Sequence, residues 1–144
     1  MRDAEYVSKD EVRKVCKALG LRDWSRMKKP EVSAAEARII LKALDPRDMD
    51  PELEDFRMGL EVELEHGTMY ADTNVTNNHP LLTGKIVLAH MKETLDYYRR
   101  LEVMELEGDL LKAMAAGKAG KAGDYFRRLL KARLTLSRTE AGQV

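Results

Sequence analysis

The chain has 144 residues with 25 basic and 25 acidic side chains, so its formal net charge is zero and no global field attracts nucleic acid or a membrane. Its apolar fraction of 44% and charged fraction of 35% are typical of a folded domain and exclude wholesale disorder. The single cysteine, Cys16, cannot form an internal disulfide, and no apolar run suits a membrane span or a signal peptide.

Two segments begin with the same helix-start signal. Glu11 follows Ser8 at a spacing of three, and Glu36 follows Ser33 in the same way. In such a capping box the serine hydroxyl accepts from the third helical amide and the glutamate reaches back to the serine amide. Gly20 supplies the left-handed residue that ends the first helix. The two helices either pack as a similar pair or resemble each other only because helical patterning fixes which residues recur.

A third helix is expected to begin with Asp50 as its cap and Pro51 at its first position. Residues 58–64 alternate between apolar and polar side chains, as a strand would. The capped start, the stop signal at Gly67 and the surrounding helices nevertheless favour a helix over this segment.

The segment from Thr68 to Pro80 is the longest irregular stretch of the middle region. Residues 72–78 are rich in side chains that hydrogen-bond nearby backbone, which predicts an ordered loop over the core. Pro80 opens a fourth helix that is apolar nearly all round, so we expect it to be the most buried element. Gly59 and Gly84 would each let a neighbouring helix approach closely.

A bend near residues 94–96 is expected to start a fifth helix. A set of residues spaced alternately by four and three predicts its packing seam. The members of this seam are Tyr97, Leu101, Met104, Gly108 and Leu111.

The C-terminal part of the chain is basic. Residues 117–123 repeat Gly, Lys and Ala, which predicts a flexible hinge. Asp124 would then cap a last helix that carries Phe126, Leu129 and Leu130 on one face. Eight basic residues and one acid lie between 112 and 138, whereas residues 50–66 hold seven acids and one Arg. The neutral total therefore hides two opposed charge patches.

The stretch from Phe56 to Glu105 resembles the core of a known family, domain of unknown function 5661, which is found in bacteria and some phages. The motifs that carry the resemblance are Phe56–Gly67, Thr73–Asn77, Thr83–His90 and Asp96–Glu102. The resemblance implies a small helical domain with a family-like core over residues 50–107, and it supplies no established activity. We expect a cytoplasmic or a virion-associated location.

These patterns predict an all-α protein. We expect a compact orthogonal bundle of about five helices over residues 1–116, then the hinge at 117–123, then an amphipathic basic helix and tail over 124–144.

Four side chains of the central segment could form a metal site. Glu63 and His66 are three residues apart, as are His90 and Glu93, so each pair points the same way on a helix. Two facing helices with these pairs could hold a divalent first-row metal. The alternative is structural, because His66 can cap its helix end, His79 can cap the fourth helix and His90 can be a core histidine paired with a carboxylate.

Glu61 and Glu65 are the second choice for metal ligands. They lie four residues apart between apolar neighbours, and burial together would raise their pKa values as in an acid–base pair. Such a pair more often meets a basic partner such as Arg57. No catalytic set is indicated elsewhere, since Cys16 lies on an apolar helix face, where a thiol is inert.

The favoured function is a non-catalytic interaction or assembly module, which the occurrence of the family in phages connects with phages, with metal binding as the alternative. We expect a protein partner or self-association through the C-terminal basic helix. Nucleic acid is weakly supported, because Tyr125 and Phe126 are too few for a stacking platform, and no membrane contact is expected.

Overall fold

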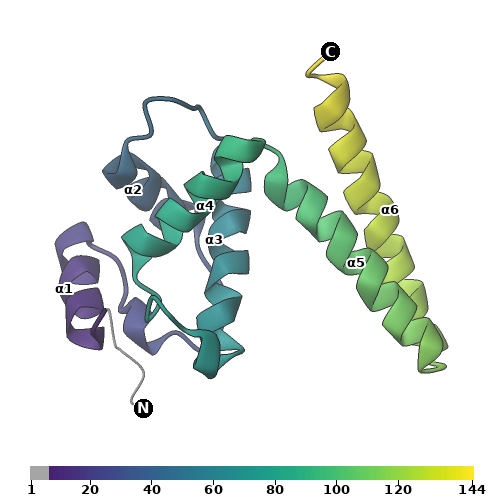
Figure 1. The fold of residues 1–144 in the computed structure, drawn as a ribbon, viewed down its shortest axis with the longest axis horizontal. Helices are drawn as coiled ribbons and strands as arrows, with labels where there is room; N and C mark the ends of the chain where they lie inside the picture. The colour runs from purple at the N-terminus through teal and green to yellow at the C-terminus, as the bar shows by residue number, and fades with distance from the viewer. Residues whose placement is uncertain (1–6) are drawn as a thin grey trace. The chain divides into compact units, whose positions relative to one another are not determined.

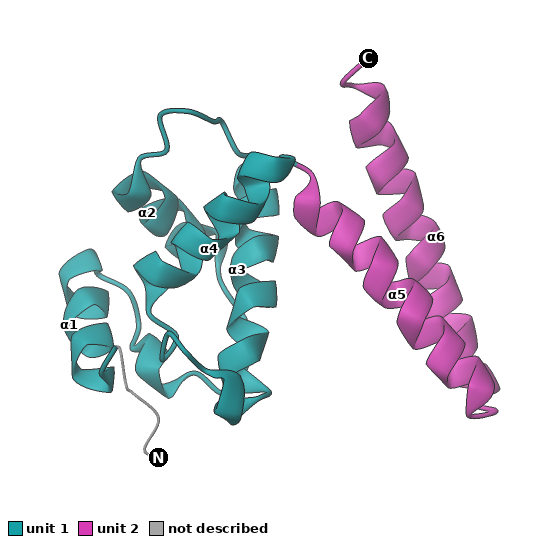
Figure 2. Ribbon diagram, viewed as in Figure 1, with its two compact units in different colours: residues 1–95 teal, residues 96–144 magenta. Residues whose placement is uncertain are grey.

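The computed structural model describes residues 7–144, which contain six α-helices, two short 3-10 turns and no strand (Figure 1). The all-α class is therefore confirmed. The helices are α1 (Lys9–Leu19), α2 (Ala34–Leu44), α3 (Leu53–Thr68), α4 (Pro80–Glu93), α5 (Tyr97–Ala115) and α6 (Ala119–Ala141), and the 3-10 turns are η1 (Trp24–Arg26) and η2 (Ala71–Thr73). The chain divides into two compact units, residues 1–95 and 96–144 (Figure 2). None of the described helices is both long and apolar enough to cross a membrane.

The predicted starts of α1 and α2 are confirmed. The Ser8 hydroxyl accepts from the Glu11 amide at 3.2 Å, and Gly20 ends α1 with φ 71°. At the start of α2 the capping box is complete, because Ser33 accepts from the Glu36 amide and Glu36 accepts from the Ser33 amide at 3.0 Å. Local hydrogen bonding therefore fixes both helix starts.

Glu36 also joins η1 to α2. The indole Nε1 of Trp24, which is fully buried, donates to Glu36 Oε1 at 3.1 Å, and Arg22 Nε donates to the same oxygen at 2.8 Å. Partial burial raises the pKa of Glu36, but the hydrogen bonds from Ser33, Trp24 and Arg22 outweigh it and lower this pKa below its ordinary value. The capping carboxylate is thus held in its charged form.

The ambiguous middle segment is a helix, as predicted, and α3 buries Phe56, Leu60 and Leu64. Its expected cap at Asp50 is wrong, because α3 begins at Leu53 and its N-cap residue makes no side-chain cap hydrogen bond. Pro51 is buried, so the chain packs the proline before the helix instead of using it as the first helical residue.

Pro80 opens α4 as predicted, and Gly84 allows α4 to approach α2 and α3 closely. A Cβ at Gly84 would lie 2.6 Å from Leu44 Cδ1, 3.0 Å from Ile40 Cγ2 and 3.4 Å from Phe56 Cζ. The contact therefore has no room for a branched side chain. The predicted central position of α4 rests on this approach.

Unit 2 is a hairpin of α5 and α6, with a core of Leu106, Leu129 and Ala132. The seam predicted for α5 is wrong, because Met104 and Leu111 are 59% and 69% exposed. The side of α5 that packs against α6 instead carries Val103, Leu106, Leu110 and Ala113. Both sets repeat at spacings of three and four, so only the position of α6 selects between them.

The expected hinge is helical from Ala119 onward, and the turn between α5 and α6 is short, with Gly117 at φ 67°. Asp124 does not cap α6; it pairs with Arg127 within the helix. Packing against α5 outweighs the low helix propensity of the glycines. At the open end of the hairpin, Arg100 ties α5 to α6 through Glu140 at 2.9 Å.

Gly84→Val should destabilise unit 1 by about 1–3 kcal/mol, because the new methyl groups overfill the contact with α2 and α3. The fluorescence of the single tryptophan, Trp24, reports this transition in urea, since the indole is buried in unit 1.

The matched control is Gly108→Ala in α5, where an added Cβ meets nothing within 4 Å. This variant should not lower the urea midpoint of the Trp24 transition, and it should stabilise α5 by about 0.5–1 kcal/mol. A Gly84→Val midpoint equal to that of the native chain would contradict the close approach.

Candidate functional sites

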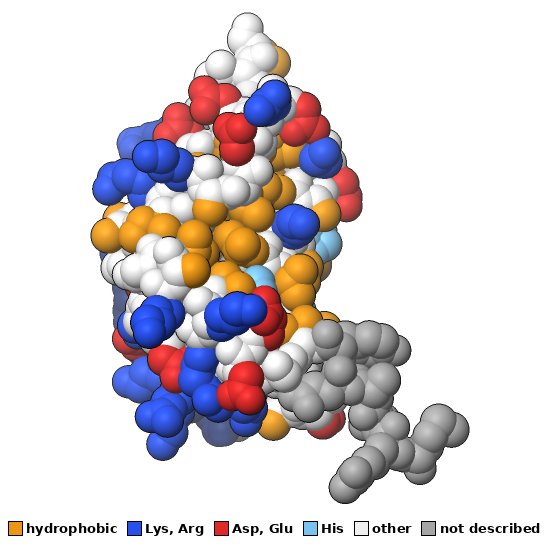
Figure 3. All heavy atoms as spheres, turned by 90° about the vertical axis from the view of Figure 1, so that its left-hand side faces the viewer, with side chains coloured by type: hydrophobic (Ala, Val, Ile, Leu, Met, Phe, Trp, Pro, Cys, Tyr) orange, Lys and Arg blue, Asp and Glu red, His pale blue; other side chains and the backbone are white. Residues whose placement is uncertain are grey.

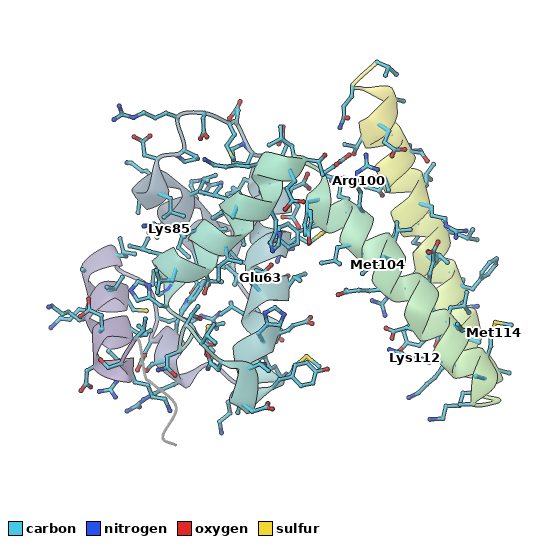
Figure 4. The ribbon with its side chains drawn as sticks, viewed as in Figure 1. Glu63, Lys85, Arg100, Met104, Lys112 and Met114 are labelled. Carbon is cyan, nitrogen blue, oxygen red and sulfur yellow. The ribbon has the colours of Figure 1, made fainter. Side chains whose placement is uncertain are left out.

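The structure places His66 and His90 next to Glu63, whose side chain projects from α3 and is 7% exposed (Figure 4), and it places Glu93 next to His90. Glu63 Oε2 lies 3.6 Å from His66 Nδ1, and Glu63 Oε1 lies 3.6 Å from His90 Nε2. On its other side, His90 Nδ1 lies 3.9 Å from Glu93 Oε1. Helical spacing predicted the pairs Glu63–His66 and His90–Glu93, and the contact between Glu63 and His90 comes from the packing of α3 against α4.

The arrangement is a chain of carboxylates and imidazoles. The two ring nitrogens of His90 point in different directions, toward Glu63 and toward Glu93, and one ion cannot bind both nitrogens of one ring. Among residues 7–144, no group of three or more His, Cys, Asp or Glu side chains is placed to hold a metal ion. The four-ligand metal site stays a prediction.

Glu61 has a structural partner on α3. Glu61 Oε1 accepts from Arg57 Nη1 at 2.6 Å and from the Val32 amide at 2.9 Å, so it ties α3 to the segment before α2. The pKa of Arg57 is raised, first by its hydrogen bond to Glu54 and further by Glu61. Glu65 is half-buried on the same helix. The charge of Glu61 is therefore balanced by Arg57, the basic partner that the sequence suggested.

His79 caps α4, as the structural reading of the histidines predicted. Its Nδ1 accepts from the Leu82 amide at 3.3 Å, so this nitrogen carries no proton and the imidazole is neutral. Burial has the largest effect and lowers the pKa of His79; the backbone of His79 and the charge of Glu11 raise this pKa by less, and the Lys85 charge, the smallest effect, lowers it.

Cys16 is buried on α1, and burial raises the pKa of its thiol. A thiol with a raised pKa is a poor nucleophile, because only the thiolate attacks.

The hairpin of unit 2 has an open apolar groove of about 650 Å³ near its turn. Its lining includes Leu110, Met114, Ala119, Ala122, Gly123 and Phe126, and we call it the hairpin groove. Met114, Phe126 and the neighbouring Leu130 are 64%, 50% and 49% exposed. The predicted apolar face of α6 is therefore split, with Leu129 packed against α5 and Phe126 and Leu130 in solvent. The sequence pattern predicted this apolar face on α6 alone, and it did not predict that Leu110 and Met114 of α5 belong to it.

Charged side chains of both signs are mixed on one face of the molecule, whereas α5 and α6 each carry a segment of a single sign. On the face of the molecule that Figure 3 shows, basic and acidic side chains are interspersed around an apolar band, with no field of one sign. On α6, residues 127–138 carry five bases and no acid, whereas residues 102–109 of α5 carry four acids and no base. In this hairpin, Arg133 Nη2 donates to Glu107 Oε1 at 2.5 Å.

The family model described as "Protein of unknown function (DUF5661)" matches residues 12–107, which are 96 of the 144 residues. The chain belongs to this family. The match runs from α1 into α5, beyond both ends of the motifs noted in the sequence, and α6 lies outside it. No curated protein and no solved structure matches the chain.

His79→Asn should reduce the acid sensitivity of folding. Because the pKa of His79 is lower in the folded chain than its ordinary value of 6.5, protonation favours unfolding. The cap, worth about 1 kcal/mol, is fully present above this ordinary value and is lost as the pH falls through the folded-state pKa. Asn caps a helix without titrating.

Urea unfolding, followed at neutral and at mildly acidic pH, measures this difference. The variant should match the native chain at neutral pH and lose less stability in acid. An equal loss of stability in both proteins would show that the ring of His79 is not the titrating cap.

Proposed function

We propose that the protein is a non-catalytic assembly module that pairs with a second copy of itself through the α5–α6 hairpin. In the proposed dimer, two hairpins pack by their groove faces into a four-helix bundle. The observation that supports this proposal is the hairpin groove, together with the half-exposed Phe126 and Leu130 beside it.

The hairpin has a thin core of its own. Three side chains, those of Leu106, Leu129 and Ala132, are buried in this cluster, and three more are partly buried against them. Small helical units with so little buried area usually gain stability by association. A second hairpin would remove further apolar surface from water, at about 25 cal/mol per Å².

Charge favours a second copy over an unrelated partner. When α5 of one copy lies over α6 of the other, the acidic residues 102–109 come level with the basic residues 127–138. This pairing keeps neighbouring helices antiparallel, as in up-and-down bundles. Phe126 and Leu130 of one copy then lie against Leu110 and Met114 of the other. The same surface therefore supplies both the apolar contact and its charged rim.

Leu130→Asp should weaken the dimer by roughly 10- to 100-fold, because it places a carboxylate in the apolar contact. Sedimentation equilibrium of the full chain over a range of concentrations gives the association constant. Leu130 is half-exposed in the single chain, so the variant should keep its helix content, which circular dichroism checks.

The matched control is Thr135→Asp, which adds the same charge to an exposed position on a different side of α6. This variant should associate like the native chain. A native chain that stays monomeric at every concentration, or a dimer that Leu130→Asp leaves unchanged, would overturn the proposal.

A further inference from the structure

A small polar cavity lies beneath the asparagine-rich loop, where the end of α3 meets the start of α4. Its volume is about 20 Å³, which is room for one water molecule or one ion. Polar side chains from three segments line it: Glu63 and His66 from α3, Asn74 and Thr76 from the loop, and Thr83 from α4. We call it the loop cavity.

Asn74, one of the residues that line the cavity, carries an acceptor atom without a hydrogen-bond partner. Its Oδ1 is buried and accepts no hydrogen bond. Its Nδ2 donates to the Gly67 carbonyl oxygen at 3.5 Å, which leaves Oδ1 as the amide atom without a partner. A buried amide oxygen without a partner is unfavourable, so a ligand that satisfies it is favoured.

The loop is held down by a contact that needs glycine. A Cβ at Gly67 would overlap Asn78 Oδ1 and would lie 2.7 Å from Asn74 Cγ. Asn78 is buried, and its Nδ2 donates to the Trp24 carbonyl oxygen at 3.3 Å, so the loop cannot easily retreat. The backbone N–H of Asn78 donates to the Thr76 hydroxyl at 3.2 Å, and the hydroxyl oxygen is the acceptor of this bond. Acceptor atoms are thus held in place around the cavity.

We propose that the loop cavity binds one divalent cation, held by Glu63 Oε2, His66 Nδ1 and Asn74 Oδ1, with water completing the coordination. The 3.6 Å between Glu63 Oε2 and His66 Nδ1 suits this role. Two ligands that each lie about 2.1 Å from one ion are roughly 3.0–3.5 Å apart, so a small adjustment closes the site.

The ligand set selects the kind of ion. Carboxylate and amide oxygens suit Mg²⁺, Ca²⁺ and Mn²⁺, whereas an imidazole suits first-row transition metals. Mn²⁺ accepts both kinds of ligand. The ion therefore belongs to the Mn²⁺ class, and Mn²⁺ is the probe for the experiment.

This site differs from a four-ligand site on the same helices. His90 faces the other carboxylate oxygen of Glu63 and acts as a positioning residue that orients it. Glu93 lies beyond His90 and takes no part in binding. The loop cavity lies wholly in unit 1, so cation binding there is independent of the association proposed for unit 2.

Isothermal titration of Mn²⁺ into the full chain, purified without an affinity tag, should show one ion bound per chain. Glu63→Gln keeps the shape of the side chain and removes its charge, and it should weaken binding by at least about tenfold. Asn74→Ala should also weaken it. Glu93→Gln is the matched control, an equal loss of charge one imidazole away, and should leave the affinity unchanged.

Paramagnetic broadening by Mn²⁺ gives a second measurement on the native chain, which matters if the Glu63 variant does not fold. The resonances of His66, Asn74 and Thr83 should broaden first, at the lowest Mn²⁺ concentration. Absence of binding to the folded native chain, or broadening centred on other carboxylates, would overturn the proposal. So would a loss of affinity in Glu93→Gln equal to that in Glu63→Gln.

Discussion

Each unit is stabilised by burying the apolar faces of its helices. Unit 1 buries these faces more completely than unit 2 does. In unit 1, α4 packs closely against α2 and α3, because Gly84 removes the side chain that would separate them. Phe56, Leu60 and Val87 are thereby fully buried. In unit 2, two helices alone cannot cover each other, so Phe126 and its neighbours remain in solvent. The stability of unit 1 and the association proposed for unit 2 follow from the same constraint.

Features that depend on a few adjacent residues could be predicted from the sequence. Ser8, Ser33, Gly20 and Pro80 act through hydrogen bonds or backbone angles within one turn, and all four take their predicted roles. The start of α3 and the start of α6 could not be predicted in this way, because packing of residues distant in the chain decides them. The predicted seam of α5 was wrong for the same reason, since α5 carries two apolar stripes of equal spacing.

The candidate sites show a similar division. Helical spacing gives the pairs Glu63–His66 and His90–Glu93, because residues three apart share a face. It could not give the direction of each ring nitrogen or the position of Asn74, which depend on how the loop closes over Gly67. The loop had been expected to be ordered, and its buried Asn78 agrees with this. Its chemistry appears only when α3, α4 and the loop are placed together.

In the proposed dimer the hairpin of unit 2 completes its core with a second copy, whereas unit 1 is complete in one chain. Amide hydrogen exchange of the full chain at several protein concentrations tests it directly. Protection of α5 and α6 should rise with concentration, while protection of α3 and α4 should not change. Protection of α5 and α6 that is independent of concentration would contradict the claim.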